Sequence, residues 1–393
     1  MSDPPGVVDG RLSSSSAGQQ PEWEEDSAVA AVRAELAALP PLVGLDEVAT
    51  LGKLLAEVAA GELQVIQAGD CAEDLRECEP DFVSRKVGLL DSLAGLMRAN
   101  SGKPVIRVGR IAGQFAKPRS NPTERRGDVE LPAFRGLLVN GPEFDRASRR
   151  PDPRRMLTCH HAAARTLDFL RSGTVVPGEP AVWASHEALV LDYELPQVHR
   201  DHAGRPLLTS THWPWIGDRT RRLDGAHVGL LASVANPVAC KIGPGVSPAE
   251  AVALAAALDP DRIPGRLTFI ARMGANLVAD RLPDLVAAMR AAGRPVIWLC
   301  DPMHGNTISV GGRKTRLLPA LRHEVTEFQR VLAAQGVDAG GLHLETTPLP
   351  VRECLESEQD DANGPYTTLC DPRLNTQQAL GLVEAWTRVA VLR

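Results

Sequence analysis

A chain of 393 residues with 44% hydrophobic content can bury a large core, and above about 250 residues such a chain forms either two domains or one α/β barrel with additions. The formal net charge of -6 and the isoelectric point near 6.0 argue against a nucleic-acid-binding or membrane-surface protein. No apolar run reaches about 18 residues, and the N-terminus has neither a basic start nor an apolar stretch, so we expect no signal peptide, no membrane span and a cytoplasmic location.

The N-terminal part of the chain divides into a tail and a helical extension. Residues 1–18 are rich in Ser, Gly, Pro and Asp, which predicts a disordered tail. Residues 19–62 contain two Ala/Leu-rich stretches with helical spacing, Ser27–Leu39 and Leu45–Ala60, separated by a Pro-Pro break. We expect these two helices to pack outside the main body, as an oligomer contact or as a lid over the bottom of a barrel, rather than to take part in catalysis. Residues 63–393 then form the catalytic domain.

From Leu63 onward, short apolar runs that end in polar residues alternate with helical stretches. The fourth run is the weakest prediction of a strand, because Pro214 interrupts it. Eight parallel strands alternating with helices predict a (β/α)8 barrel better than an open sheet. The eight runs are Gln64–Asp70, Val105–Arg110, Ala181–Glu187, His212–Asp218, Pro237–Gly243, Leu267–Gly274, Val296–Met303 and Gly341–Thr347.

Helical stretches fall between most of these runs. The connection from Lys117 to Pro180 is too long for a simple crossover, so we expect it to contain further helix, around Arg154–Arg171. The other predicted helices are Asp81–Arg98, Leu223–Val234, Pro248–Leu258, Asp280–Ala292, Ala320–Gln335 and Thr376–Leu392.

Four side chains with metal-binding chemistry follow strands one, seven and eight. Cys71 comes after the first strand, and His304 follows the seventh. Glu345 ends the eighth strand, and Asp371 lies in the loop beyond it. These strands are neighbours in a closed barrel, so we expect one thiolate, one imidazole and two carboxylates at one rim, a set that suits Mn, Co, Fe or Zn. Each residue alone has an ordinary explanation, since an isolated Cys is usually buried filler and an isolated Asp-Pro is usually a turn.

Cationic side chains also gather at the predicted strand ends. Any one of them could form a surface salt bridge, but a group at one barrel end needs anionic partners. Arg presents a planar fork to phosphate or carboxylate and Lys a point charge, so the mixture predicts more than one anionic group. Ser120 and Asn121 add neutral donors. The cations are Arg110, Lys117, Arg119, Arg219, Lys241 and Arg272.

Nine motifs stand in order along the chain: QAGDCAE, RVGRIAGQFAKPRS, WASHEALVLDYE, WIGDRTRRLDGAHV, NPVACKIGP, RMGA, DPMHGNT, HLE and CDPRLN. These motifs make the chain similar to the type II, plant-like 3-deoxy-D-arabino-heptulosonate-7-phosphate (DAHP) synthases. They occur in that family's order and extend from Gln19 to the C-terminal helix. The resemblance implies a metal-dependent (β/α)8 barrel that condenses phosphoenolpyruvate with erythrose 4-phosphate, in the first committed step of the shikimate pathway to aromatic amino acids.

The same resemblance assigns roles to residues of this chain. Mn2+ or Co2+ is the expected cofactor, with Mg2+, Fe2+ and Zn2+ as alternatives. Among these residues, the resemblance implies catalytic roles for Lys117, Arg110, Lys241 and His304. The implied metal ligands are Cys71, His304, Glu345 and Asp371. The implied phosphoenolpyruvate site consists of Arg110, Arg219, Lys241 and Arg272, with Trp215, Glu187 and Asp218 alongside, and the implied erythrose 4-phosphate site consists of Lys117, Arg119 and Ser120, Lys117 reaching both substrates.

Departures from the family pattern leave several questions open. The linker between KPRS and WASHE is short and lacks a helical insertion that binds aromatic amino acids in longer members, so we expect weak or absent inhibition by Trp, Phe and Tyr. Short members often serve secondary metabolism, such as phenazine pathways. Asp218 stands where Glu is commoner, and ETTPLPVREC also departs from the usual run. An imino analogue of the sugar phosphate is therefore an alternative acceptor.

Two other classes of protein are alternatives to this interpretation. One rival is a related barrel enzyme with another acceptor, and the other is a non-catalytic descendant, which the loss of a metal ligand would have favoured. We expect a homodimer or higher homo-oligomer with no nucleic-acid or membrane partner, and a chorismate mutase partner stays open. Seven cysteines do not form a disulfide framework, although Cys71 and Cys370 would lie close enough to pair in metal-free protein.

Overall fold

The structure is a computed structural model that describes residues 17–172, 182–201, 203–360 and 363–387, together with two short strands before them. These strands, β1 (Val7–Val8) and β2 (Arg11–Leu12), pair with each other in antiparallel orientation. The rest of the predicted tail, up to residue 16, lies outside the described residues.

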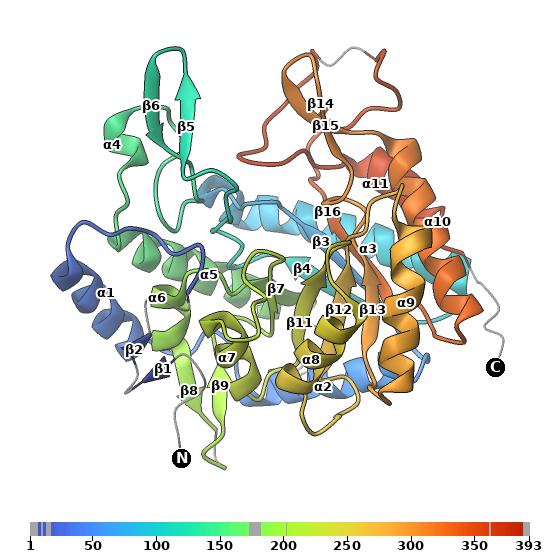
Figure 1. The fold of residues 1–393 in the computed structure, drawn as a ribbon. Helices are drawn as coiled ribbons and strands as arrows, with labels where there is room; N and C mark the ends of the chain where they lie inside the picture. Colours follow the sequence, from blue (N-terminus) through green and yellow to red (C-terminus); the bar gives the residue numbers. More distant parts are fainter. Residues whose placement is uncertain are drawn as a thin grey trace.

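Eight parallel strands close into a barrel, as predicted (Figure 1). Every predicted apolar run contributes one strand, and strands one, seven and eight (β3, β13 and β16) are indeed neighbours. In ring order the strands are β3 (Gln64–Gly69), β4 (Val105–Arg110), β7 (Trp183–Glu187), β10 (Trp213–Ile216), β11 (Val238–Ile242), β12 (Leu267–Ala271), β13 (Ile297–Cys300) and β16 (Gly341–Glu345).

Pro214 lies inside β10 without preventing the strand. It stands opposite His186 of β7, while the pairing of β10 with β11 begins one residue later, at Trp215. The missing N–H of Pro214 therefore precedes the ladder with β11.

The outer helices follow the predicted positions closely, and local signals explain their ends. Ser247 caps α8 by accepting a hydrogen bond from the Glu250 N–H, and Gly102, with φ 74°, ends α3. The helices are α3 (Pro80–Ser101), α5 (Arg154–Ser172), α7 (Ala226–Ser233), α8 (Pro248–Leu258), α9 (Val278–Ala291), α10 (Leu318–Ala334) and α11 (Thr376–Val383), and shorter turns are α4 (Arg146–Arg149), α6 (Leu191–Glu194) and the 3-10 helices η1 (Leu75–Cys78) and η2 (Leu195–Gln197).

The C-terminal helix was predicted too long. It ends at Val383, whereas the prediction extended it to Leu392. Residues 388–393 lie outside the described part of the chain. After a turn at residues 384–385, the buried Trp386 donates a hydrogen bond from Nε1 to Gln64 Oε1 at 3.2 Å and packs near Phe328. The burial of this large ring favours leaving the helix over extending it.

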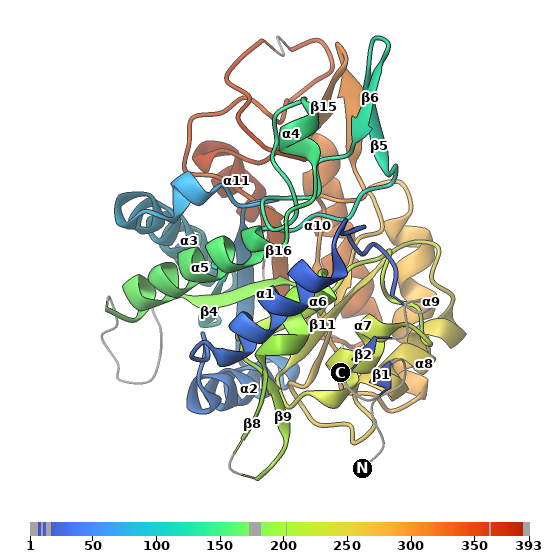
Figure 2. The ribbon, with the colours of Figure 1, turned by 90° about the vertical axis from the view of Figure 1, so that its left-hand side faces the viewer.

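The second N-terminal helix closes the bottom of the barrel. Helix α2 (Leu45–Ala59) lies below the barrel strands (Figure 1), and its Leu51, Leu55 and Val58 belong to one buried hydrophobic cluster with barrel residues such as Trp213. Each fully buried aliphatic side chain contributes roughly 1.5–3 kcal/mol, so α2 is part of the core rather than an appendage. Helix α1 (Asp26–Ala38) lies against α5 and α6 (Figure 2).

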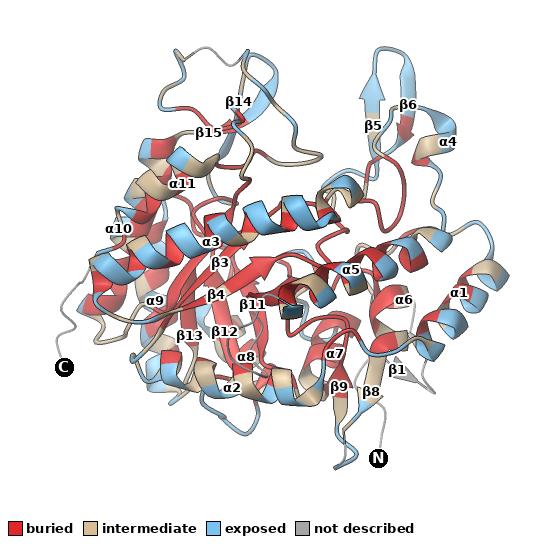
Figure 3. Cartoon of the chain, turned by 180° about the vertical axis from the view of Figure 1, so that it is seen from behind, coloured by how far each residue is buried: buried red, intermediate tan, exposed pale blue. Residues whose placement is uncertain are grey.

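The barrel is buried, and the outward sides of the surrounding helices are exposed to solvent. The barrel strands are buried, whereas α3 and α5 show exposed residues along their outward sides (Figure 3). In the part of the chain that the structure describes, no helix is both long and apolar enough to span a bilayer.

Two hairpins that the alternating pattern did not predict stand above the same end of the barrel (Figures 1 and 2). One joins β5 (Thr123–Arg126) to β6 (Val129–Pro132), and the other joins β14 (Thr307–Val310) to β15 (Arg313–Arg316). Gly311 and Gly312 both have positive φ, which the tight turn of the second hairpin requires. A third hairpin, β8 (Val198–Arg200) with β9 (Pro206–Leu208), lies near the bottom.

Candidate active site

A cavity of about 650 Å3 opens at the C-terminal ends of the barrel strands, between the two upper hairpins. This is the end of a parallel barrel where ligand sites form. Arg110, Trp215, Cys71 and Glu345 lie beneath its floor rather than along its wall. The predicted site residues that line it are Lys117, Arg119, Ser120, Glu187, Asp218, Arg219, Lys241, Arg272, His304 and Asp371.

The four predicted metal ligands converge under this cavity. Ligand atoms of Cys71, Glu345 and Asp371 all lie within 4.8 Å of one another. His304 joins them, because its Nε2 atom lies 3.0 Å from Glu345 Oε1. The loop before Leu374 brings in Asp371, whose N–H donates to Cys71 Sγ at 3.3 Å. One thiol and two carboxylates thus form a compact group, and the imidazole of His304 adjoins it at Glu345, a donor set that suits a divalent metal.

A cation already lies among three of these donors. Lys117 Nζ is 2.8 Å from Cys71 Sγ, 2.9 Å from Asp371 Oδ2 and 3.4 Å from Glu345 Oε1. Burial opposes the charge on Lys117, but Asp371, Cys71 and Glu345 outweigh it and raise the pKa of the ammonium well above its usual value. The donor set therefore fits a positive ion, on its electrostatics as well as on its ligand types.

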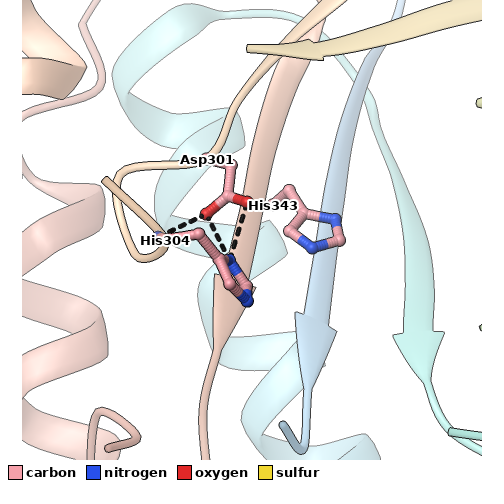
Figure 4. A group of neighbouring side chains, drawn as sticks. All are labelled: Asp301, His304 and His343. Atoms are coloured by element: carbon pink, nitrogen blue, oxygen red, sulfur yellow. Dashed lines mark hydrogen bonds and ion pairs between the residues drawn. The ribbon is translucent and has the colours of Figure 1, made fainter. Parts of the chain in front are cut away.

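Asp301 orients the imidazole of His304 (Figure 4). Asp301 Oδ2 lies 2.8 Å from His304 Nδ1 and 2.9 Å from Lys241 Nζ, and Oδ1 accepts the backbone N–H of Met303 and of His304. Burial raises the pKa of Asp301, but the charges of His304 and Lys241 hold it well below its ordinary range. A carboxylate on one ring nitrogen leaves the other to face the ligands. Sequence reasoning quoted Asp301 but assigned it no role.

Arg110 is committed to protein partners. Its Nε donates to the Asp70 carbonyl at 2.9 Å, Nη1 lies 2.6 Å from His343 Nε2, and Nη2 lies 3.0 Å from Glu345 Oε1. Trp215 lies under the Arg110 guanidinium, 5.3 Å from ring centroid to guanidinium carbon. The structure therefore places Arg110 below the cavity in contact with Glu345, with Trp215 against its guanidinium. The predicted contact of these two residues with phosphoenolpyruvate stays a prediction.

The second hairpin supplies two cations that sequence reasoning missed. Arg316 is fully buried, and its Nη1 lies 2.8 Å from Glu345 Oε2. Lys314 Nζ lies 2.8 Å from Asp371 Oδ1. Although burial raises the pKa of Glu345, the neighbouring charges of His304, Lys117, Arg316 and Arg110 hold it well below its usual value. The RKTR run shows in the sequence that cations cluster here, but no predicted helix or strand placed this run near the site.

The remaining predicted cations do gather at the cavity. Arg219 Nη2 donates to Ser120 Oγ at 2.6 Å, and Arg272 donates from Nη1 to Asp218 Oδ2 at 2.9 Å and from Nη2 to the His304 carbonyl at 2.6 Å. Arg119 pairs with Glu124 at 2.8 Å.

Glu187 adds a buried carboxyl to the cavity wall. Its Oε1 has no hydrogen-bond partner among the residues that the structure describes. Burial raises the pKa of Glu187, which favours the neutral form beside anionic ligands.

Comparison with known proteins gives one consistent family. Residues 9–178 and 176–386 match the Class-II DAHP synthetase family. A Pseudomonas fluorescens protein named probable phospho-2-dehydro-3-deoxyheptonate aldolase is 52% identical over 376 residues, which cover 94% of each chain. Phospho-2-dehydro-3-deoxyheptonate aldolases of Streptomyces coelicolor and Mycolicibacterium smegmatis are 39% and 38% identical, covering 93% of this chain and 93% and 90% of their own.

The alignments with the last two proteins extend over 420 and 423 positions, more than the 393 residues of this chain, so both relatives contain residues that this chain lacks. A solved structure of the Francisella tularensis phospho-2-dehydro-3-deoxyheptonate aldolase superposes with a TM-score of 0.55 at 12% identity, covering 91% of this chain and 95% of that one. At that identity the likeness supports the barrel fold alone.

Proposed function

The chain belongs to the class-II DAHP synthetase family and is a DAHP synthase, the enzyme of the first step of the shikimate pathway. From that premise we propose that its reaction depends on a divalent metal. The proposed ligands are Cys71, His304, Glu345 and Asp371. The observation that supports this most directly is the gathering of Cys71, Glu345 and Asp371 around the Lys117 ammonium, with His304 next to Glu345 and Asp301 behind His304. A bound divalent cation would polarise the aldehyde carbonyl of erythrose 4-phosphate. The mixed donor set accepts several metals, and the family resemblance makes Mn2+ and Co2+ the first choices among them.

We assign the phosphoenolpyruvate site to the cations on the β10 to β12 side of the cavity. Lys241, Arg272 and Arg219 line the wall there, with Glu187 and Asp218 beside them. Phosphate and carboxylate groups bind well to the planar guanidinium groups of Arg and to the ammonium group of Lys when these are held in place. Arg110 lies below and holds Glu345 through its Nη2 atom, and the Trp215 ring lies against the same guanidinium.

Erythrose 4-phosphate then takes the opposite side of the cavity. Arg119, Ser120 and Lys117 lie on the segment that follows β4, and Ser120 is already hydrogen-bonded to Arg219. Because Lys117 contacts the ligand cluster as well, its charge reaches both substrates.

The arrangement of fixed charges accounts for the condensation. C3 of phosphoenolpyruvate attacks the aldehyde carbon, water adds at C2, and the resulting hemiketal phosphate releases inorganic phosphate. The two anionic substrates repel each other in water, and the cations of the cavity hold them together without reorganising during the reaction.

The test is phosphate release from phosphoenolpyruvate by chelator-stripped protein, with and without Mn2+ or Co2+ and with and without erythrose 4-phosphate. Release that needs both metal and sugar supports the proposal. Metal-independent release would remove the metal from the mechanism, and metal binding without release would remove erythrose 4-phosphate as the acceptor.

The narrower assignments are a role in secondary metabolism, a homo-oligomeric state and a cytoplasmic location. They rest on the short linker after KPRS, on the family resemblance and on the composition. An imino analogue of erythrose 4-phosphate is the alternative acceptor, because Asp218 departs from the family pattern. Its carboxylate lines the cavity and pairs with Arg272 and Arg221. A competition assay with both acceptors separates the two.

A further inference from the structure

One buried carboxylate holds the loop that carries Asp371. Glu353 Oε1 accepts the backbone N–H groups of Thr367 and Thr368 at 2.9 and 2.8 Å, and Oε2 accepts the N–H of Arg373 at 2.7 Å. Glu353 is almost completely buried. A single acceptor that binds both ends of residues 367–373 fixes the course of the loop between them.

Arg373 extends this contact to the strand end that carries Cys71. Its guanidinium binds Glu353 through Nε and Nη2, at 3.2 and 3.1 Å, and reaches Asp70 Oδ1 with Nη1 at 2.7 Å. Asp70 directly precedes Cys71, and Arg373 stands two residues after Asp371. One planar side chain therefore joins two segments that are 303 positions apart in the sequence.

The far side of Asp70 is held as well. Lys86 of α3 lies 2.7 Å from Asp70 Oδ2, and both side chains are buried. Burial raises the pKa of Asp70, but Lys86 and Arg373 lower it below the ordinary value. A buried charge pair is weak evidence for stability, because desolvation offsets the attraction. Stability alone therefore does not explain why Glu353, Arg373, Asp70 and Lys86 form a continuous row of buried charges.

We propose that Glu353 and Arg373 are positioning residues that hold the Cys71 and Asp371 segments against each other, so that both donors face the same metal ion. The inference rests on the proposed metal dependence. Neither residue lines the cavity or reaches the ligand atoms, and both act through the backbone that presents Cys71 and Asp371. Outer partners of this kind typically change metal affinity by about 10- to 100-fold.

The experiment is a Mn2+ titration of chelator-stripped protein without substrates, with free Mn2+ read from its electron paramagnetic resonance signal. Arg373→Lys keeps the charge and loses the fork, and Glu353→Gln keeps the shape and loses the charge. Both should weaken Mn2+ binding by about 10- to 100-fold. Hydrogen exchange should show faster amide exchange in residues 367–373 of both variants, because their shared acceptor is weakened. Arg171→Lys is the matched control, since Arg171 forms a similar two-pronged pair with Glu47 at the opposite end of the barrel, and it should leave Mn2+ affinity unchanged.

A milder variant keeps the test decisive if Arg373→Lys does not fold. Thr367→Val removes one contact of the guanidinium, the 2.8 Å hydrogen bond from Nη2 to Thr367 Oγ1, and should weaken Mn2+ binding about fivefold. Folded variants that bind Mn2+ within about twofold of the parent protein would overturn the inference while leaving the metal site in place. A parent protein that binds no Mn2+, Co2+ or Zn2+ would overturn the proposed metal dependence and this inference together.

Discussion

Asp301 and His304 form a pair in which the carboxylate fixes the direction of the imidazole. Asp301 Oδ2 lies 2.8 Å from His304 Nδ1, and His304 Nε2 lies 3.0 Å from Glu345 Oε1. The ring therefore presents one nitrogen to its support and the other to the candidate metal ligands (Figure 4). His343, drawn beside them, binds Arg110 instead, through its Nε2.

Asp301→Asn should weaken metal binding by about 10- to 100-fold, because an amide is a poorer partner for the Nδ1–H group. Lys241 would lose its charged partner at the same time, so KM for phosphoenolpyruvate should rise as well. Mn2+ titration and initial-rate kinetics measure the two effects. Asp259→Asn, a change in the loop after α8, is the control and should alter neither. Unchanged Mn2+ affinity in Asp301→Asn would contradict the orienting role.

Cys71→Ser should change the choice of metal more than the fold. The substitution replaces a soft sulfur ligand by a hard oxygen of similar size, so affinity for Zn2+ and Co2+ should fall further than affinity for Mn2+. Competitive titration of the three metals gives the comparison, and Cys159→Ser in α5 is the control for loss of a buried thiol. Equal losses for all three metals would argue that Cys71 is not a ligand.

The barrel and the position of the candidate metal ligands at one rim could be predicted because both depend on order along the chain, while the ligand role itself stays a prediction. Once eight strands alternate with helices, the C-terminal ends of neighbouring strands must meet, and Cys71, His304 and Glu345 come together without any knowledge of side-chain packing. Asp371 followed because its loop leaves the last strand. These positions depend on topology alone.

The direction of individual side chains could not be predicted in this way. Arg110 ends a strand as Lys241 does, yet His343 and the Asp70 carbonyl hold it below the cavity floor. Arg316 belongs to a hairpin outside the alternating pattern. Glu353 pairs with Arg373 across loops that have no periodicity to read. Such contacts depend on three-dimensional packing, which one sequence does not reveal.

Cys71 and Cys370 should form a disulfide when metal-free protein is exposed to air. Both cysteines are free in the structure, and Cys71 Sγ accepts the backbone N–H of Asp371, the residue next to Cys370, at 3.3 Å. A bound metal would occupy Cys71 and protect it. Thiol titration after chelation and aeration should show two fewer thiols than the metal-loaded protein, and Cys370→Ser should abolish the difference. Seven free thiols after that treatment would reject the prediction.

Glu47 should make stability depend on pH at the bottom of the barrel. Partial burial raises its pKa, but His212, whose Nε2 lies 3.6 Å from Glu47 Oε2, and Arg171, which donates to both carboxylate oxygens, outweigh burial and hold the pKa below the ordinary value of 4.5. A carboxyl with a depressed folded-state pKa contributes stability above its unfolded pKa, and that contribution is lost as pH falls below about 4.5.

The variant Glu47→Gln isolates this contribution. It should lower the unfolding free energy by about 2 kcal/mol at pH 7, and by progressively less toward pH 3, because the unfolded parent chain then binds a proton at Glu47 that the folded protein does not bind. Urea unfolding at pH 7, 5, 4 and 3 measures both curves. Glu57→Gln, on the same helix, is the control. A difference between parent and Glu47→Gln that stays constant with pH would contradict the assignment.

Aromatic amino acids should inhibit this enzyme weakly or not at all. The segment between Ser120 and Trp183 contains the β5–β6 hairpin, α4 and α5 in its described part, with residues 173–181 outside it. The two relatives with longer alignments contain residues that this chain lacks, in agreement with a missing insertion. An inhibitor needs a pocket that couples to the active site, and the family resemblance assigns that pocket in longer members to an insertion for which the linker after KPRS is short. Initial rates with Trp, Phe and Tyr, singly and combined, should therefore stay near the uninhibited value, with the Streptomyces coelicolor protein assayed in parallel. Strong inhibition of this enzyme at micromolar concentration would show that another surface binds these amino acids.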